Sequence, residues 1–125
     1  MLTLQGATLL HVAAEYRNLE ATTLLLGRGL DVNTRAAMDD GGVGGQMAIF
    51  HAVTQFEDAG LPVARLLVER GADLAIRVKI PGHYERPGEV LDCTPLGYAI
   101  RFQDETCPGD KARTVAFLRE RGAPE

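Results

Sequence analysis

The sequence predicts an all-α fold, a solenoid of three helix–turn–helix repeats joined by extended loop or β-hairpin segments. Three observations lead to this prediction. A short alanine-containing motif recurs three times, each copy is followed by a leucine-rich segment, and each unit closes with a glycine. One helix pair cannot bury its own apolar stripe, whereas stacked pairs bury a shared one. Residues 1–125 are therefore expected to form a single domain, with repeats at about 4–35, 43–77 and 90–125.

The motif can be followed copy by copy. The copies are Thr8-Leu9-Leu10-His11-Val12-Ala13, Met47-Ala48-Ile49-Phe50-His51-Ala52 and Thr94-Pro95-Leu96-Gly97-Tyr98-Ala99. The apolar segments that follow contain Leu24-Leu25-Leu26, Leu66-Leu67-Val68 and Phe117-Leu118, and the closing glycines are Gly29, Gly71 and Gly122. Their fixed order along the chain makes the repetition much more specific than any one copy.

These residues resemble the ankyrin repeat, whose signature is Thr-Pro-Leu-His-x-Ala in a unit of about 33 residues. The third copy keeps Thr94-Pro95-Leu96, and the first keeps Thr8 and His11. The second copy departs most, with Met47 in place of threonine and Phe50 in place of histidine. The resemblance covers nearly the whole chain. It implies a stack of helix pairs with projecting loops, called fingers, that acts in protein–protein interaction.

The spacing departs from the family. The motif starts at Thr8, Met47 and Thr94, so the periods are 39 and 47 residues. Part of the excess falls inside the second and third helix pairs, around Phe56 to Pro62 and Gln103 to Asp110, where inserted loops are expected. The rest lengthens the links between repeats.

Local residue types agree with the helix pairs. Thr8 and Thr94-Pro95 suit the start of a first helix, because threonine caps free amides and proline needs no partner there. Asn18, Asp58 and Asp110 are expected at the starts of the second helices, as capping or pre-cap residues that satisfy free amides there. The closing glycines suit the left-handed conformation that ends a helix.

The two fingers differ. The first finger, Asp31 to Gln46, contains Asp39-Asp40-Gly41-Gly42-Val43-Gly44-Gly45, which predicts a flexible tip. The second finger, Leu74 to Leu91, alternates apolar residues with Arg77 and Lys79 before a Pro81-Gly82 turn signal. This pattern predicts a β-hairpin.

Composition excludes several classes of protein. The chain is 46% apolar and 24% charged, which is typical of a globular domain rather than a disordered chain. No apolar run approaches the roughly 18 residues of a membrane span. A net charge of −4 argues against nucleic-acid binding. With two cysteines and no signal-peptide pattern, a reducing, cytoplasmic setting is expected.

No catalytic, metal or cofactor site is predicted. The glycine-rich tip lacks the Gly-Lys-Ser/Thr ending of a phosphate-binding loop and follows two aspartates. His11 occupies the position at which the family's histidine bonds neighbouring backbone, and the three histidines lack metal-ligand spacing. Cys107 follows acidic residues that suppress its thiolate. Cys93 precedes a helix start, whose dipole is expected to lower its pKa modestly.

Candidate partner-binding residues come from the resemblance. Variable positions of the family follow the motif's alanine, on a concave side, and one further set lies in the second finger. The helix positions are Glu15, Tyr16, Thr54, Gln55, Arg101 and Phe102, and the finger positions are Arg77, Lys79, Tyr84 and Arg86, with His83 among them. The finger set is locally basic and suggests an acidic partner segment, although a solvated hairpin face is an equal interpretation. Phe102 is alternatively a residue that packs under the inserted loop.

The predicted function is therefore a non-catalytic, monomeric interaction module that binds another protein or peptide, without nucleic acid or membrane. One alternative is a structural or capping part of a longer ankyrin array, because terminal repeats carry polar outer faces. Residues suited to such faces are Ala21-Thr22-Thr23 in the first repeat and Arg113, Arg119, Glu120 and Arg121 in the third. A weaker alternative is an enzyme or redox protein that uses Cys93 or Cys107.

Overall fold

The described helices form three consecutive pairs. In this computed structural model, residues 4, 6–81, 88–106 and 111–125 are described, with the backbone only for residue 56 and residues 102–106. The first pair is α1 (Leu9–Glu15) and α2 (Leu19–Gly27), the second is α3 (Ala48–Ala52) and α4 (Leu61–Glu69), and the third is α5 (Pro95–Thr106) and α6 (Ala112–Glu120). A short 3₁₀ turn, η1 (Phe56–Asp58), lies between α3 and α4, and the strands β1 (Val78–Pro81) and β2 (Val90–Cys93) precede α5.

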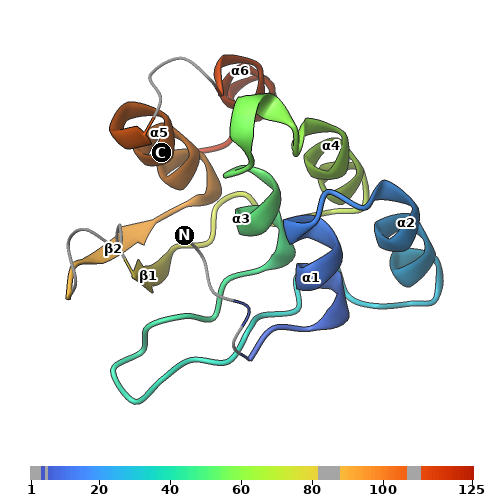
Figure 1. Cartoon of the computed structure of the whole chain (residues 1–125), viewed down its shortest axis with the longest axis horizontal. Coiled ribbons are helices and arrows are strands. Elements are labelled where there is room, and N and C mark those ends of the chain that lie inside the picture. Colours follow the sequence, from blue (N-terminus) through green and yellow to red (C-terminus); the bar gives the residue numbers. More distant parts are fainter. Residues whose placement is uncertain (1–3, 5, 82–87, 107–110) are drawn as a thin grey trace.

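The pairs stack in chain order. The first helices pack side by side, α1 against α3 and α3 against α5, and the second helices do the same, α2 against α4 and α4 against α6 (Figure 1). One apolar cluster runs through all the pairs, from Leu10 in α1 to Leu118 in α6. The result is a helical repeat fold, in which each pair buries its apolar face against its neighbours.

Phe50 shows why the second motif departs from the signature. Its side chain is fully buried, and its ring centroid lies 6.0 Å from that of Tyr98, in the first helix of the next pair. An aromatic ring at this position adds apolar contact between the second and third pairs, where a histidine would need a polar partner.

The predicted helix ends are largely confirmed. The Asn18 side chain accepts a hydrogen bond from the Ala21 amide at 3.0 Å, so Asn18 caps α2. Thr94 accepts from the Gly97 amide at 3.1 Å at the start of α5. Gly29 has a φ of +94°. Its amide donates to the Leu26 carbonyl, and the amide of Leu30 donates to the Leu25 carbonyl. This is the Schellman arrangement, and it recurs at the other two closing glycines, Gly71 and Gly122.

The prediction for Asp58 is wrong. α4 begins at Leu61 behind Gly60, and Asp58 instead caps α6 of the following pair. Its Oδ1 accepts from the amide and hydroxyl of Thr114 at 2.8 and 2.6 Å, and its Oδ2 from the Arg113 amide at 3.3 Å. The left-handed turn through Glu57 and Asp58 points the carboxylate at the neighbouring helix, because η1 packs beside α6. Asp110, the corresponding prediction for the third pair, lies outside the described residues.

The inserted residues of the third pair also differ from expectation. Residues 103–106 extend α5 by a turn rather than forming a loop, since α5 runs without interruption from Pro95 to Thr106. The rest of that insertion lies outside the described residues.

The second finger contains the predicted hairpin. β1 and β2 pair antiparallel, with Val78 opposite Cys93 and Ile80 opposite Leu91. Val78 and Ile80 are buried while Lys79 is exposed, as the alternation predicts. Gly82 of the predicted Pro81-Gly82 turn signal lies outside the described residues.

The tip of the first finger, which the sequence predicts to be flexible, makes several hydrogen bonds. Asp39 Oδ1 accepts from the amides of Gly41 and Val43, both at 2.9 Å, and the Gly44 amide donates to the Lys79 carbonyl of β1 at 2.7 Å. The glycines allow a tight turn that Asp39 closes, and the turn is attached to the hairpin. Within the described residues, no helix is long and apolar enough to cross a membrane.

Replacing Gly60 by alanine is expected to lower the free energy of unfolding by about 1–3 kcal/mol, the usual range for overpacking. A Cβ atom at Gly60 would fall far inside contact distance of the Ala52 carbonyl oxygen, so the backbone must move. Gly27→Ala is the matched control, because a Cβ there meets nothing within 4 Å and alanine favours the helix by up to about 1 kcal/mol. Urea unfolding of both variants checks the pair, and equal effects would contradict the packing argument.

Asp58→Ala is expected to cost about 1–2 kcal/mol of unfolding free energy, because it removes the cap of α6. Asp58→Asn should cost less, since asparagine keeps an acceptor oxygen and tolerates the left-handed backbone. Asp40→Ala, at an exposed position of the first finger, is the control and should be near neutral. Thermal or urea unfolding measures the stability of the three variants. Equal stability of Asp58→Ala and Asp40→Ala would contradict the role of Asp58 as a cap of α6.

Candidate functional site

The predicted recognition residues begin at the ends of the first helices. Tyr16 is the C-cap of α1 and 68% exposed. Thr54 follows the end of α3, is half-buried and donates to the Phe50 carbonyl at 3.1 Å. Arg101 is exposed on α5, and its Nη2 lies 3.3 Å from Glu89 Oε1. The side chain of Phe102 lies outside the described residues, so its packing under the loop is not tested.

Glu15 and Gln55, by contrast, are parts of an internal network. Gln55 is only 9% exposed, and its Nε2 donates to Glu15 Oε2 at 2.6 Å and to the His51 carbonyl at 2.8 Å. Both hydrogens of the Gln55 amide are thus used inside the protein, which leaves its carbonyl oxygen for other contacts. Gln55 therefore orients Glu15 rather than acting as an independent surface residue.

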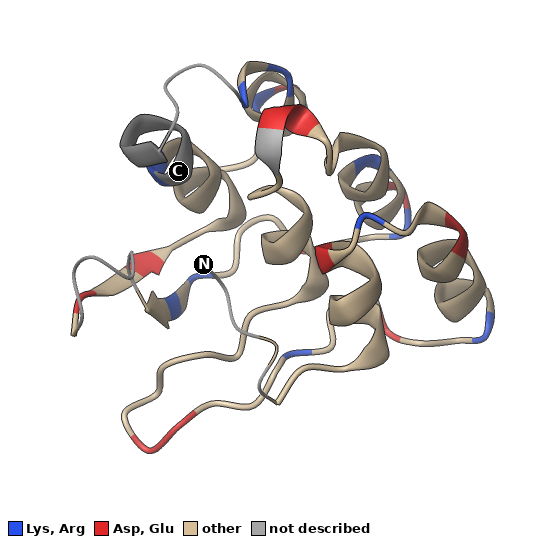
Figure 2. Cartoon of the chain, in the orientation of Figure 1, with Lys and Arg blue, Asp and Glu red and all other residues tan. Residues whose placement is uncertain are grey.

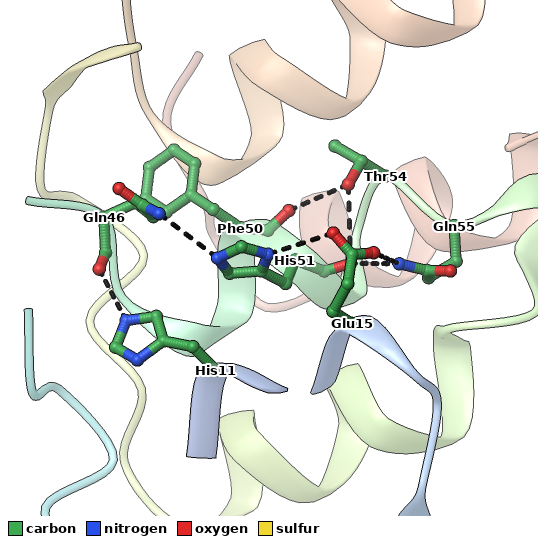
Figure 3. A network of polar contacts seen from close by, with 7 residues as sticks. All are labelled: His11, Glu15, Gln46, Phe50, His51, Thr54 and Gln55. Carbon is green, nitrogen blue, oxygen red and sulfur yellow. Dashed lines mark hydrogen bonds and ion pairs between the residues drawn. The ribbon is translucent and has the colours of Figure 1, made fainter. Parts of the chain in front are cut away.

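His51 is the second group that holds Glu15. Its side chain is fully buried, and its Nδ1 lies 3.2 Å from Glu15 Oε1 (Figure 3). The other ring nitrogen, Nε2, lies 3.2 Å from Gln46 Nε2. With the Gln46 amide donating to Nε2, the neutral ring carries its proton on Nδ1 and donates it to Glu15. The carboxylate thus receives one neutral donor on each oxygen.

His11 joins the same network from the other side. Its Nδ1 lies 3.2 Å from the Thr8 amide and 2.8 Å from the Thr8 hydroxyl, and its Nε2 lies 2.7 Å from the Gln46 carbonyl oxygen. The bond to Gln46 joins the first pair to the segment before α3, which confirms the interpretation of His11 as a bridge to neighbouring backbone. Burial lowers the pKa of His11 below its usual value of 6.5, and the nearby His51 acts in the same direction.

Sequence reasoning did not identify the roles of Gln46 and His51. A signal was present, because His51 stands one place beyond the position at which the signature has histidine. Because the histidine stands at position 51 and not at position 50, its imidazole does not form the cap that His11 forms with Thr8. It points toward α1, where Glu15 accepts its hydrogen bond.

Arg77 and Lys79, the two described residues of the predicted basic set in the second finger, lie beside acidic residues. The Arg77 guanidinium is used on Asp92, with Nε 3.3 Å from Oδ1 and Nη2 2.9 Å from the backbone oxygen. Lys79 is exposed, but Asp92 lies opposite it in the hairpin and Glu89 stands just before β2. Basic residues at β1 therefore face acidic residues at β2 (Figure 2). His83, Tyr84 and Arg86 lie outside the described residues.

The expected depression of the Cys93 pKa is wrong. Burial raises the pKa of the thiol to about 11, and Asp92 adds to the increase, while Arg77 and Arg101 only partly offset it. A thiol with this pKa is protonated at neutral pH and a poor nucleophile. Cys107 lies outside the described residues. Among those described, no group of three or more His, Cys, Asp or Glu side chains could hold a metal ion.

The stability of the protein is expected to fall as the pH drops below about 6.5. His11 has a lowered pKa in the folded state, so the unfolded chain binds the additional proton first, and unfolding is favoured. Above the unfolded pKa this contribution to stability is complete. Urea unfolding between about pH 8 and pH 5 measures it, and the dependence should be weaker in His11→Gln. An unchanged dependence in that variant would assign the effect to other groups.

Comparison with protein families places one full repeat unit in the chain. The ankyrin repeat family model matches residues 5–37, which include α1, α2 and the start of the first finger. A search of curated proteins gave no match. The matched segment contains the Thr8–His11 cap and the closing Gly29, whose geometry the structure displays. Residues 5–37 of the chain are therefore an ankyrin repeat.

Proposed function

We propose that the chain is a non-catalytic adaptor, an ankyrin-repeat α-solenoid of three repeats whose concave surface binds another protein or peptide. Ankyrin repeats generally mediate protein–protein interaction, and the family is generally non-enzymatic. We call the residues at the ends of the first helices the recognition face, which comprises Glu15, Tyr16, Thr54, Gln55, Arg101 and Phe102. We also propose that the chain acts as a monomer in the reducing environment of the cytoplasm.

The observation that carries the proposal is the exposure of Tyr16 beside a fixed carboxylate. α1, α3 and α5 lie side by side, so the equivalent positions after each motif fall in one row (Figure 1). Tyr16 is 68% exposed in this row, and Arg101 is exposed two helices away. Tyrosine and arginine are enriched among residues that anchor partners. Because packed helices and hydrogen bonds already hold these positions, binding costs little ordering entropy.

A second candidate rests on exposed leucines of the first pair. Leu9, Leu19 and Leu24 are 69%, 44% and 57% exposed, which is unusual for leucines on two neighbouring helices. The exposed residues of α6, by contrast, include Arg113, Arg119 and Glu120. Thr22 and Thr23 of the expected polar cap use their hydroxyls on backbone carbonyls within α2. This asymmetry favours the alternative of a structural part of a longer array, which would cover these leucines.

The recognition face is tested by affinity capture with the full chain and its Tyr16→Ala and Arg101→Ala variants, followed by quantitative mass spectrometry. A specific partner is expected to be depleted at least several-fold with either variant, because anchor residues carry most of the binding energy. Arg28→Ala, at the exposed C-cap of α2, is the matched control and should retain the partner.

A partner that binds both variants as well as the wild type would contradict the recognition face. Retention of a second ankyrin-repeat segment by all three variants would favour the array alternative instead.

A further inference from the structure

The geometry points to Glu15 as a preorganised acceptor for a cationic side chain, so that the recognition face takes a partner segment carrying an arginine or lysine. This inference rests on the proposed function and names the chemistry of the partner.

The carboxylate of Glu15 is held from inside the protein. His51 Nδ1 lies 3.2 Å from Oε1, and Gln55 Nε2 lies 2.6 Å from Oε2 (Figure 3). Both donors come from the second pair and are almost completely buried, at 0% and 9% exposure. Since the donors are fixed by packing, Glu15 has its position before any partner arrives.

The two groups that hold the carboxylate of Glu15 do so through hydrogen bonds. With Gln46 donating to His51 Nε2, both groups that hold Glu15 are neutral donors. Among the described residues, no lysine or arginine lies within ion-pair distance of Glu15. Each carboxylate oxygen can accept a second hydrogen bond, so accepting capacity remains.

This capacity is open to a partner. The Glu15 side chain is 22% exposed, whereas the groups behind it are buried. A carboxylate that is partly removed from water interacts more strongly with an incoming cation than a fully solvated carboxylate does. Glu15 is also the last residue of α1, where free carbonyl groups disfavour an anion and favour a cation.

The neighbouring side chain supplies the second part of the site. Tyr16 follows Glu15 directly and is 68% exposed, so an aromatic ring and a carboxylate occupy adjacent positions of the recognition face. Arginine and lysine are the side chains that combine ion pairing with contact to an aromatic ring. The net charge of −4 favours approach of a basic segment as well. An acidic segment, which the second finger suggested at first, would meet Glu15 as a like charge.

The experiment is a selection from a random displayed-peptide library on the immobilised full chain. Peptides that lose affinity for Tyr16→Ala bind the recognition face and are retained. Each is then synthesised with its arginine or lysine replaced by glutamine. Fluorescence anisotropy gives the Kd of both peptide forms for the wild type, Glu15→Gln and Glu20→Gln. Glu20 is an exposed glutamate on α2 and provides the matched control.

We expect the peptide change and Glu15→Gln each to weaken binding on the order of tenfold, and the two together to weaken it hardly further. Glu20→Gln should bind like the wild type. Should Glu15→Gln fail to fold, the Glu15 side-chain carboxyl ¹³C shift of the wild type decides, because it should move with the cationic peptide and not with its glutamine form.

The outcomes separate the two proposals. Face-dependent peptides without an essential cation, or undiminished binding to Glu15→Gln, would overturn the cation site and leave the recognition face intact. If no peptide binds, or if all bind Tyr16→Ala as well as the wild type, the proposed function fails and the cation site with it.

Discussion

The contact between one helix pair and the next is the constraint on which this structure depends, because no pair has enough apolar surface for a core of its own. The apolar part of this contact includes Phe50 against Tyr98. The polar part satisfies groups that burial would otherwise leave unpaired, such as the Gln46 carbonyl that meets His11. Both parts are needed, since an unpaired buried polar group costs as much as a good apolar contact contributes.

The polar contacts between the first two pairs lead from the interior to the surface. His11 meets the Gln46 backbone, the Gln46 side chain meets His51, and His51 meets Glu15. Each hydrogen bond fixes which atom of the next group donates, so the orientation of one side chain determines the others. The stacking of the helices and the position of a surface carboxylate are in this way set by the same residues.

Much of the fold could be predicted from the sequence, because local rules govern it. The helix pairs, the closing glycines, the Asn18 cap and the hairpin follow from residue type and periodicity. What could not be predicted depends on contacts between pairs. Asp58 has the residue type of a cap, but only the path of η1 decides which helix it reaches. The place of Cys93 before a helix start, known from the sequence, did not reveal that burial raises the pKa of its thiol.

The candidate site divides in the same manner. The family pattern selected Glu15, Tyr16 and Thr54 as candidates, since these positions follow directly from the motif. It did not distinguish Tyr16, which faces solvent, from Gln55, which holds Glu15. That difference arises because the equivalent positions of two repeats do not meet the same neighbours. The ion pair of Arg77 with Asp92 was not predicted for a related reason, because the two residues lie far apart in sequence but close in the hairpin.

The cap that Asp58 supplies to α6 determines what happens when the insertion in the second pair is shortened. Asp58 lies among the residues that make this pair longer than a standard repeat, and it holds Thr114 and Arg113 of the next pair. Shortening the second pair to the usual length would therefore remove a cap from a helix more than fifty residues further along the chain. The additional residues connect the second pair to the third. Deleting them would destabilise the third pair without stabilising the second.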